Sequence, residues 1–190
     1  MVGGDVPTGR GVLLGLKGHL YEGYWKQGEY HSIGRVIHRN GNIYQGELIL
    51  GPANGHGKYF WPDGASFEGI WKDDQKNGHG VKIEKSGNRY DGNFKNDKYN
   101  GFGTLTYKSG GDVYKGFWKD NRMHGQGKYL WSGGSYYDGE WNDSQFHGLG
   151  HLKLNRESYM GMFQNDKKHG FGTKAWAEGD KFSGYWKDDK

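Results

Sequence analysis

The 190-residue chain contains no cysteine, only three prolines and no long apolar run. Without cysteine it can form neither a disulfide framework nor a thiolate zinc site, and this fits a reducing compartment. A membrane-spanning helix needs about 18 consecutive apolar residues, which the chain does not offer. Acidic and basic residues alternate, so there is no block of like charge to indicate a disordered interaction tail.

Glycine and aromatic residues are abundant instead. The chain has 37 glycines, and aromatic residues make up 16% of it, although hydrophobic residues reach only 33%. Disordered segments are poor in aromatic residues, so we expect a folded protein whose apolar surface is supplied by rings. The net charge of +4 is mild and does not by itself select a nucleic acid or a membrane as partner.

Eight copies of one motif follow each other: an aromatic residue, any residue, glycine, any residue and a second aromatic residue. The first positions are Tyr21, Tyr44, Phe67, Tyr90, Tyr114, Tyr137, Tyr159 and Phe182. The fifth positions are Trp25, Leu48, Trp71, Phe94, Trp118, Trp141, Phe163 and Trp186, so only the second copy lacks the second ring. Residues 21 and 182 are 161 positions apart over seven intervals, a mean period of 23. A fixed period of this length is typical of stacked-repeat proteins.

Each repeat has the pattern of a β-hairpin. Tyr114, Gly116 and Trp118 alternate with mostly polar residues, and strand side chains alternate between the two faces of a sheet. Asp120-Asn121 follows, and Asp and Asn tolerate the positive φ of tight hairpin turns. The segment 124–131 then forms the return strand. Rings and glycines therefore share one face, and polar residues cover the other.

The predicted fold is all-β: an elongated, single-layer antiparallel β-meander of hairpin repeats. We expect one domain over 1–190, with an incoming strand at 9–18, seven full repeats from 21 to 181 and a half repeat at 182–190, giving 16 strands. Glycine columns leave a trough in which rings can lie across bare backbone, and a sheet with its bulk on one face is expected to curve into a groove. The second repeat, with Leu48 and Gly51-Pro52-Ala53, is expected to have a specialised loop.

The sequence offers no catalytic or metal-binding constellation. His31, His124, His147 and His169 share one repeat position with Asn54, Asn77 and Asn100, which indicates turn chemistry. Equivalent residues lie two strands apart, roughly 9–10 Å, so neighbouring repeats cannot easily share a metal ion. Carboxylates fall in turns or on the polar face, and no nucleophile elbow or P-loop pattern occurs. We therefore predict no enzymatic activity, no cofactor, no metal and no nucleic-acid partner.

The residues do resemble a known family. Tyr137-Asp138-Gly139-Glu140-Trp141 followed by His147-Gly148-Leu149-Gly150 is similar to the MORN (membrane occupation and recognition nexus) repeat, and so is the segment 114–127. The resemblance recurs in register along nearly the whole chain. It implies an elongated antiparallel sheet with a groove and a scaffold or adaptor role. MORN arrays occur in ciliary, flagellar and cytoskeletal structures, in membrane-junction proteins, and as accessory domains of enzymes.

We therefore predict a non-enzymatic scaffold that binds a partner protein as an extended peptide, a helix or an edge strand. The predicted location is cytoplasmic, in a cytoskeletal or ciliary assembly. The alternatives are a peripheral adaptor with weak binding to acidic phospholipids and the accessory array of a larger enzyme. Because the strand at 182–187 lacks a return strand, a homodimer formed by edge pairing is also open.

Two surfaces are predicted to make the contacts. The expected groove residues are Tyr44, Trp71, Tyr90, Tyr114, Trp118, Tyr137 and Trp141. A second contact patch on the polar face is expected at Phe117, Met160, Met162 and Tyr185.

Overall fold

The computed structural model describes residues 6–16 and 18–190, and these form one antiparallel sheet of 16 strands in chain order. The predicted antiparallel meander of hairpins is confirmed. The predicted incoming strand 9–18 is shorter in the structure, where β1 spans Gly9–Leu14, and Lys17 lies outside the described residues. Residues 1–5 of the expected 1–190 array also lie outside them.

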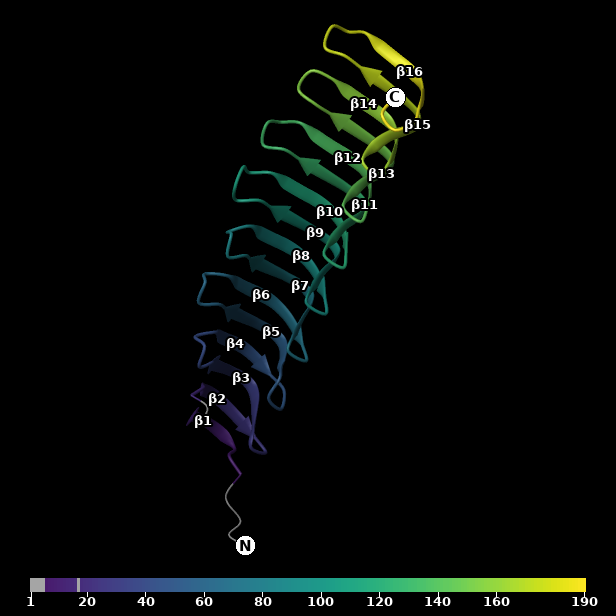
Figure 1. The fold of residues 1–190 in the computed structure, drawn as a ribbon. Coiled ribbons are helices and arrows are strands. Elements are labelled where there is room, and N and C mark those ends of the chain that lie inside the picture. The colour runs from purple at the N-terminus through teal and green to yellow at the C-terminus, as the bar shows by residue number, and fades with distance from the viewer. Residues whose placement is uncertain (1–5, 17) are drawn as a thin grey trace. The chain divides into compact units, whose positions relative to one another are not determined.

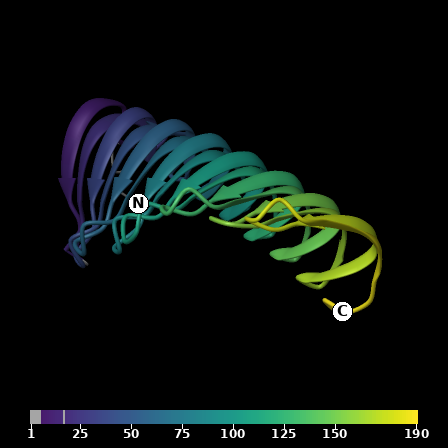
Figure 2. The same cartoon turned by 90° about the horizontal axis from the view of Figure 1, so that it is seen from above.

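Contacts group the described residues into two units, whose strands are labelled in Figure 1. Unit 1 comprises the described residues up to Gly87 together with Phe94–Asp97, and unit 2 comprises Asn88–Asn93 and Lys98–Lys190. Figure 2 shows that the strands within each unit are bent along their length. The strands of unit 1 after β1 are β2 (Leu20–Lys26), β3 (Glu29–Ile37), β4 (Ile43–Leu48), β5 (Ala53–Phe60), β6 (Ser66–Lys72) and β7 (Gln75–Ile83).

The division between the units falls within β8 (Arg89–Lys95). The other strands of unit 2 are β9 (Lys98–Thr106), β10 (Val113–Lys119), β11 (Arg122–Leu130), β12 (Tyr136–Asn142), β13 (Gln145–Lys153), β14 (Ser158–Gln164), β15 (Lys167–Ala175) and β16 (Lys181–Trp186). Each even-numbered strand from β2 carries a five-residue motif, and the following odd-numbered strand returns antiparallel to it.

Two-residue turns close six of the seven hairpins that begin with a motif strand, as the Asp and Asn pairs predicted. Asp120 has φ of 49° and Asn121 has φ of 68°, and Asp73 and Asp74 have φ of 48° and 62°. Consecutive positive φ values match the type I′ turn, whose twist fits that of the flanking strands. The second repeat differs, because its loop runs from Ile49 to Pro52 and places Leu50 and Gly51 at positive φ.

Paired glycines let the first-position ring lie flat over the backbone. Tyr114 crosses its own strand, and its hydroxyl donates to the carbonyl oxygen of Phe117 at 2.9 Å. The ring passes over Gly116 and over Gly127, its partner on β11. A Cβ at Gly116 would lie 2.5 Å from the Tyr114 Oη and 2.5 Å from the Gly127 Cα. The same hydroxyl-to-carbonyl bond is made by Tyr21, Tyr44, Tyr90, Tyr137 and Tyr159.

The fifth-position tryptophans join neighbouring repeats. The Trp118 indole N–H donates to the Gly103 carbonyl oxygen at 3.3 Å, and the Trp141 N–H donates to that of Gly127 at 2.9 Å. Each indole also packs edge-on against the first-position ring of the preceding repeat. These rings form the core of each unit, and Tyr90, Tyr114 and Tyr137 are fully buried.

Candidate functional site

The face of the sheet that carries the motif rings, the ring face, is built from the same parts in each repeat. The residue just before the recurring His or Asn of the return strand lies beside the first-position ring. We call it the stacking position; it is occupied by Tyr30, Ala53, Lys76, Tyr99, Met123, Phe146 and Lys168. Tyr99 stacks on Tyr90 with ring centroids 3.7 Å apart, and Phe146 stacks on Tyr137 at 3.8 Å.

The second residue of the next hairpin turn, which we call the tip residue, forms hydrogen bonds with the residue at the stacking position. Phe146 N donates to Asp166 Oδ1 at 2.7 Å, and Asp166 N donates to the Phe146 carbonyl oxygen at 3.1 Å. Asn121 makes the same pair of bonds with Tyr99. The tip residue of one repeat is thereby held against the strand of the repeat before it.

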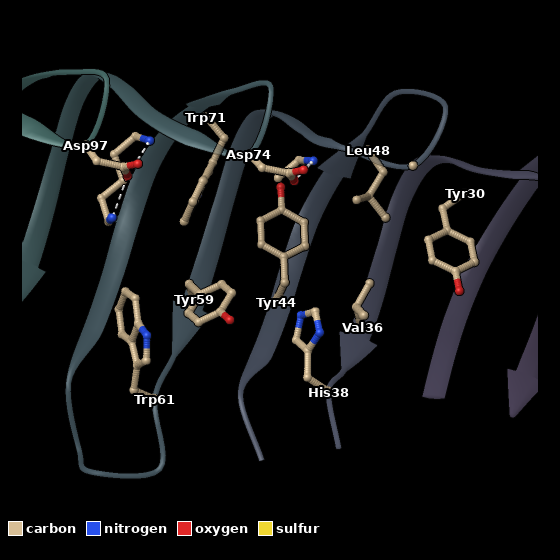
Figure 3. Close-up of a pocket in the computed structure, with 13 residues that line it drawn as sticks. Tyr30, Val36, His38, Tyr44, Leu48, Tyr59, Trp61, Trp71, Asp74 and Asp97 are labelled. Carbon is tan, nitrogen blue, oxygen red and sulfur yellow. Dashed lines mark hydrogen bonds and ion pairs between the residues drawn. The ribbon is translucent and has the colours of Figure 1, made fainter. Parts of the chain in front are cut away.

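A cavity of about 460 Å³ opens on the ring face of unit 1, beside the stacking position of the second repeat (Figure 3). Its lining is mostly aromatic and aliphatic, with the carboxylates of two tip residues at one side. The lining residues are Tyr30, Val36, His38, Tyr44, Leu48, Gly51, Ala53, Tyr59, Trp61, Trp71, Asp74, Lys76 and Asp97.

The cavity occurs in this repeat because two large side chains are absent. The fifth position holds Leu48 where other repeats hold a ring, and the stacking position holds Ala53. Tyr44 and Trp71 form the base and are almost wholly buried, while Tyr59 and Trp61 are partly exposed at its edge. The sequence predicted a specialised loop in the second repeat, which the structure has at 49–52, but it did not predict this cavity.

Burial shifts the pKa values of Tyr44 and His38, which line the cavity. Desolvation raises the pKa of the Tyr44 hydroxyl, and the charges of Glu47 and Asp74 raise it further. Desolvation lowers the pKa of His38, which favours the neutral imidazole. Around the cavity, the charged side chains are therefore those of the two tip residues and Lys76.

Asp97 at the edge of the cavity gives a pH prediction. Burial alone raises its pKa, but hydrogen bonds and the charge of Lys76 outweigh this and lower the pKa from its ordinary 3.8. A carboxyl with a depressed folded-state pKa stabilises the fold above its ordinary pKa, and this contribution disappears as pH falls through the folded value. We expect Asp97→Asn to flatten the fall in unfolding free energy below pH 4, measured by urea denaturation. An unchanged pH dependence would contradict the assignment.

The seven predicted groove residues are all ring-face residues, but they lie in the core. Tyr44, Trp71, Tyr90, Tyr114, Trp118, Tyr137 and Trp141 are between 0% and 6% exposed. A partner on this face would meet the return-strand rings first: Tyr59 and Trp61 in unit 1, and Tyr129 and Trp131 in unit 2, which we call the ring ledge. Each of these four is partly exposed. Their signal in the sequence is the period-two alternation after the second glycine of the return strand.

The four predicted residues of the polar-face patch are exposed. Phe117 is 49%, Met160 61%, Met162 39% and Tyr185 83% exposed. Met162 lies opposite Leu149, and Tyr185 lies opposite Phe171, two exposed residues that the sequence interpretation missed. Their signal is the residue between the two return-strand glycines, which also points to the polar face. Phe117 instead contacts Phe102 edge-on at 5.5 Å.

At the repeat position that is occupied by either His or Asn, the Asn side chains accept hydrogen bonds from the backbone of the next hairpin turn. Asn54 Oδ1 accepts a bond from Asp73 N at 3.2 Å, and Asn77 Oδ1 accepts one from Asn96 N at 3.3 Å. Nδ1 of His31, His124, His147 and His169 is buried and has no hydrogen-bond partner among the described residues.

Replacement of this histidine tests the role of the position. We expect His147→Asn to change the free energy of unfolding by less than about 0.5 kcal/mol, because Asn fits the same place in other repeats. We expect His147→Ala to cost about 1 kcal/mol, because it removes the partly buried ring and, unlike asparagine, supplies no side-chain oxygen to the turn. Urea denaturation of the two variants measures the difference, and equal costs would contradict the turn role.

Among the described residues, no group of three His, Asp or Glu side chains is arranged to hold a metal ion. None of them forms a helix long and apolar enough to cross a membrane.

The repeat geometry is reflected in comparisons with known proteins. The MORN repeat family model matches seven consecutive segments, and the chain belongs to this family. The matched residues are 21–43, 44–66, 67–89, 90–112, 114–136, 137–155 and 159–181. A search of curated proteins finds no match.

Two solved structures show a distant likeness to the chain. The chain is similar to the TCP domain of SAS-4 (dCPAP) of Drosophila melanogaster, solved in complex with a proline-rich motif of Ana2 (dSTIL), with 10% identity, 93% of this chain and 90% of that chain covered, and a TM-score of 0.43. It is also similar to a mutant TCP10 domain of Danio rerio CPAP, with 11% identity, 93% and 99% covered, and a TM-score of 0.27.

Proposed function

We propose that the protein is a non-enzymatic MORN-repeat scaffold that holds a segment of a partner protein on its ring face, within a cytoskeletal or ciliary assembly. The observation that carries the proposal is the cavity of about 460 Å³ in the second repeat, bordered by partly exposed Tyr59 and Trp61. The family supports the scaffold role, and it alone suggests the cellular setting.

The chemistry of the ring face suits a peptide. Binding sites are concave and mostly apolar, with a few polar groups that fix orientation, and this cavity combines rings with two carboxylates. Tyr and Trp side chains at a surface supply large contact areas at low entropic cost. Unit 2 offers the same ledge, because Tyr129 and Trp131 occupy the positions of Tyr59 and Trp61.

A phospholipid adaptor has less support from the charges. Lys58 pairs with Glu68 at 2.9 Å, and Lys128 pairs with Asp138 at 3.3 Å. Lys76 and Lys168 are mostly buried and pair with Asp97 and Asp189. Lysines held by carboxylates of the same chain are less free to neutralise anionic headgroups.

Capture of the partner from a native lysate, compared across variants, tests the proposal. We expect the double variant Trp61→Ala/Trp131→Ala to lose the partner that the wild type captures, as measured by quantitative mass spectrometry. The matched control is Phe117→Ser/Met162→Ser on the polar face, which should retain it. Circular dichroism and thermal melting confirm that all variants fold.

Loss of the partner from the polar-face control alone would overturn the ring-face proposal. Binding to vesicles of acidic phospholipid that falls steeply with salt, with no protein partner captured, would instead establish the membrane adaptor. Sedimentation of the purified chain tests for a homodimer. If the chain sediments as a dimer, and the variant Trp61→Ala/Trp131→Ala does so too, the dimer forms through a surface other than the ring face.

A further inference from the structure

Two repeats place a lysine at the stacking position and enclose its ammonium group in rings. Lys76 Nζ lies 5.7 Å from the Phe67 ring centroid and 5.6 Å from that of Trp71. It pairs with Asp97 Oδ1 at 2.7 Å, and its side chain is only 14% exposed. An ammonium group over aromatic faces and beside a carboxylate is stabilised both by the ring quadrupoles and by the opposite charge.

The seventh repeat encloses its lysine in a similar way, but its tryptophan comes from the fifth position of the next copy of the motif instead of from its own. Lys168 Nζ lies 5.8 Å from the Tyr159 ring centroid and 5.6 Å from that of Trp186. It pairs with Asp189 Oδ1 at 3.3 Å. In both cages, the backbone N–H of the lysine donates to the carboxylate of the tip residue. The backbone N–H of the tip residue donates back to the carbonyl oxygen of the lysine.

The second repeat has this framework without the lysine. Ala53 N donates to Asp74 Oδ1 at 2.7 Å, and Asp74 N donates to the Ala53 carbonyl oxygen at 3.1 Å. Tyr44 stands where Phe67 and Tyr159 stand, and Trp71 stands where Trp186 stands in the seventh repeat. Tyr44, Ala53, Trp71 and Asp74 all line the cavity in Figure 3.

We propose that the cavity beside Ala53 binds a lysine side chain of the partner, whose ammonium group lies beside Asp74 and whose methylene chain lies among the rings. This inference rests on the proposed function, because it specifies which side chain of the bound segment enters the ring face. The cavity of about 460 Å³ is large enough for a whole lysine side chain.

Charge favours a lysine over an aromatic ring at this site. Phe146 and Tyr99 show that a ring can fill a stacking position when it stacks on the first-position ring. At Ala53 no ring is present, and two carboxylates, those of Asp74 and Asp97, border the cavity against the single ammonium group of Lys76. The Asp74 side chain lies at the exposed edge of the cavity, where its carboxylate can pair with the ammonium group of a lysine and gives no comparable attraction for an uncharged ring.

Short peptides of the form acetyl-Gly-X-Gly-amide, with X as lysine, norleucine or phenylalanine, test the inference on the full chain. Binding is followed through the indole N–H resonances of Trp61 and Trp71 in ¹H–¹⁵N spectra. We expect the lysine peptide to shift both resonances and to bind at least about 10-fold more tightly than the norleucine peptide, since a desolvated cation–π contact is worth about 2 kcal/mol.

Two variants test separately the charge of the Asp74 carboxylate and the empty space beside Ala53. Asp74→Asn keeps the acceptor for Ala53 N, as Asn121 does for Tyr99 N, and should weaken lysine-peptide binding about 10-fold. Ala53→Lys should fold like the native third and seventh repeats and abolish binding, because its own ammonium group fills the cage. The matched control Asp166→Asn, at the tip facing Phe146, should leave binding unchanged.

Any of four results would overturn the lysine site. Two concern the peptides: the norleucine and lysine peptides bind equally, or the phenylalanine peptide binds more tightly than the lysine peptide. The other two are that no peptide shifts the Trp71 resonance, or that Asp74→Asn binds the lysine peptide as tightly as the wild type does. The proposed function fails separately. If the captured partner is kept by Asp74→Asn and Ala53→Lys but lost from Trp61→Ala/Trp131→Ala, the ring-face scaffold stands and the lysine site does not.

Discussion

Trp118→Ala is expected to lower the free energy of unfolding by about 3–5 kcal/mol, the range for truncating a buried large aromatic side chain. Trp118 is 6% exposed and lies between three tyrosine rings, with centroids 5.6 Å from Tyr90, 5.4 Å from Tyr99 and 5.0 Å from Tyr114. Its loss opens a cavity and leaves the Gly103 carbonyl oxygen without the indole donor. Urea denaturation followed by circular dichroism measures the change.

Trp186→Ala is the matched control. Trp186 makes the same bond, to the Gly172 carbonyl oxygen at 3.1 Å, but it is more exposed than Trp118. Its cost should be smaller than that of Trp118→Ala. Equal shifts of the denaturation midpoint at the two positions would count against an array in which rings of successive repeats support one another.

Gly116→Ala is expected to be about as damaging, at about 3 kcal/mol or more, which is the upper end of the overpacking range. The new methyl group would meet the Gly127 Cα at 2.5 Å and the Gln126 carbonyl oxygen at 2.8 Å, both backbone atoms. Neither can move without separating β10 from β11 or displacing the Tyr114 ring.

Gly133→Ala provides the comparison for this substitution. A Cβ at Gly133 meets nothing within 4 Å, and Gly133 does not have a positive φ. Its stability should stay within about 0.5 kcal/mol of the wild type in the same denaturation experiment. A tolerated Gly116→Ala would show that the first-position ring does not need the bare backbone.

Local physics made the fold predictable from the sequence. The alternation of Tyr114, Gly116 and Trp118 defines a strand face, and pairs such as Asp120-Asn121 define tight turns, so neither depends on distant contacts. The bond from each indole to a glycine carbonyl of the preceding repeat was not predicted. It depends on register between strands, which the motif alone does not define.

The candidate site was less predictable because burial is a collective property. Tyr90 and Trp118 were expected to line a groove, yet neighbouring rings bury them and leave the accessible surface to the ring ledge. The cavity at Ala53 arises from the absence of two large side chains, and a motif search records what is present. A signal existed in the spacing: Ala53, Lys76 and Lys168 each contact an Asp 21 positions later.

Hydroxyl-radical footprinting of the chain, alone and saturated with its captured partner, tests the ring-face scaffold most directly. Both faces carry reactive side chains: Tyr59 and Trp61 on the ring face, and Met160 and Met162 on the polar face. The ring-face scaffold predicts that the partner protects Tyr59 and Trp61 from oxidation and leaves the two methionines unchanged. Protection of Met160 and Met162 with no change at Tyr59 and Trp61 would contradict it.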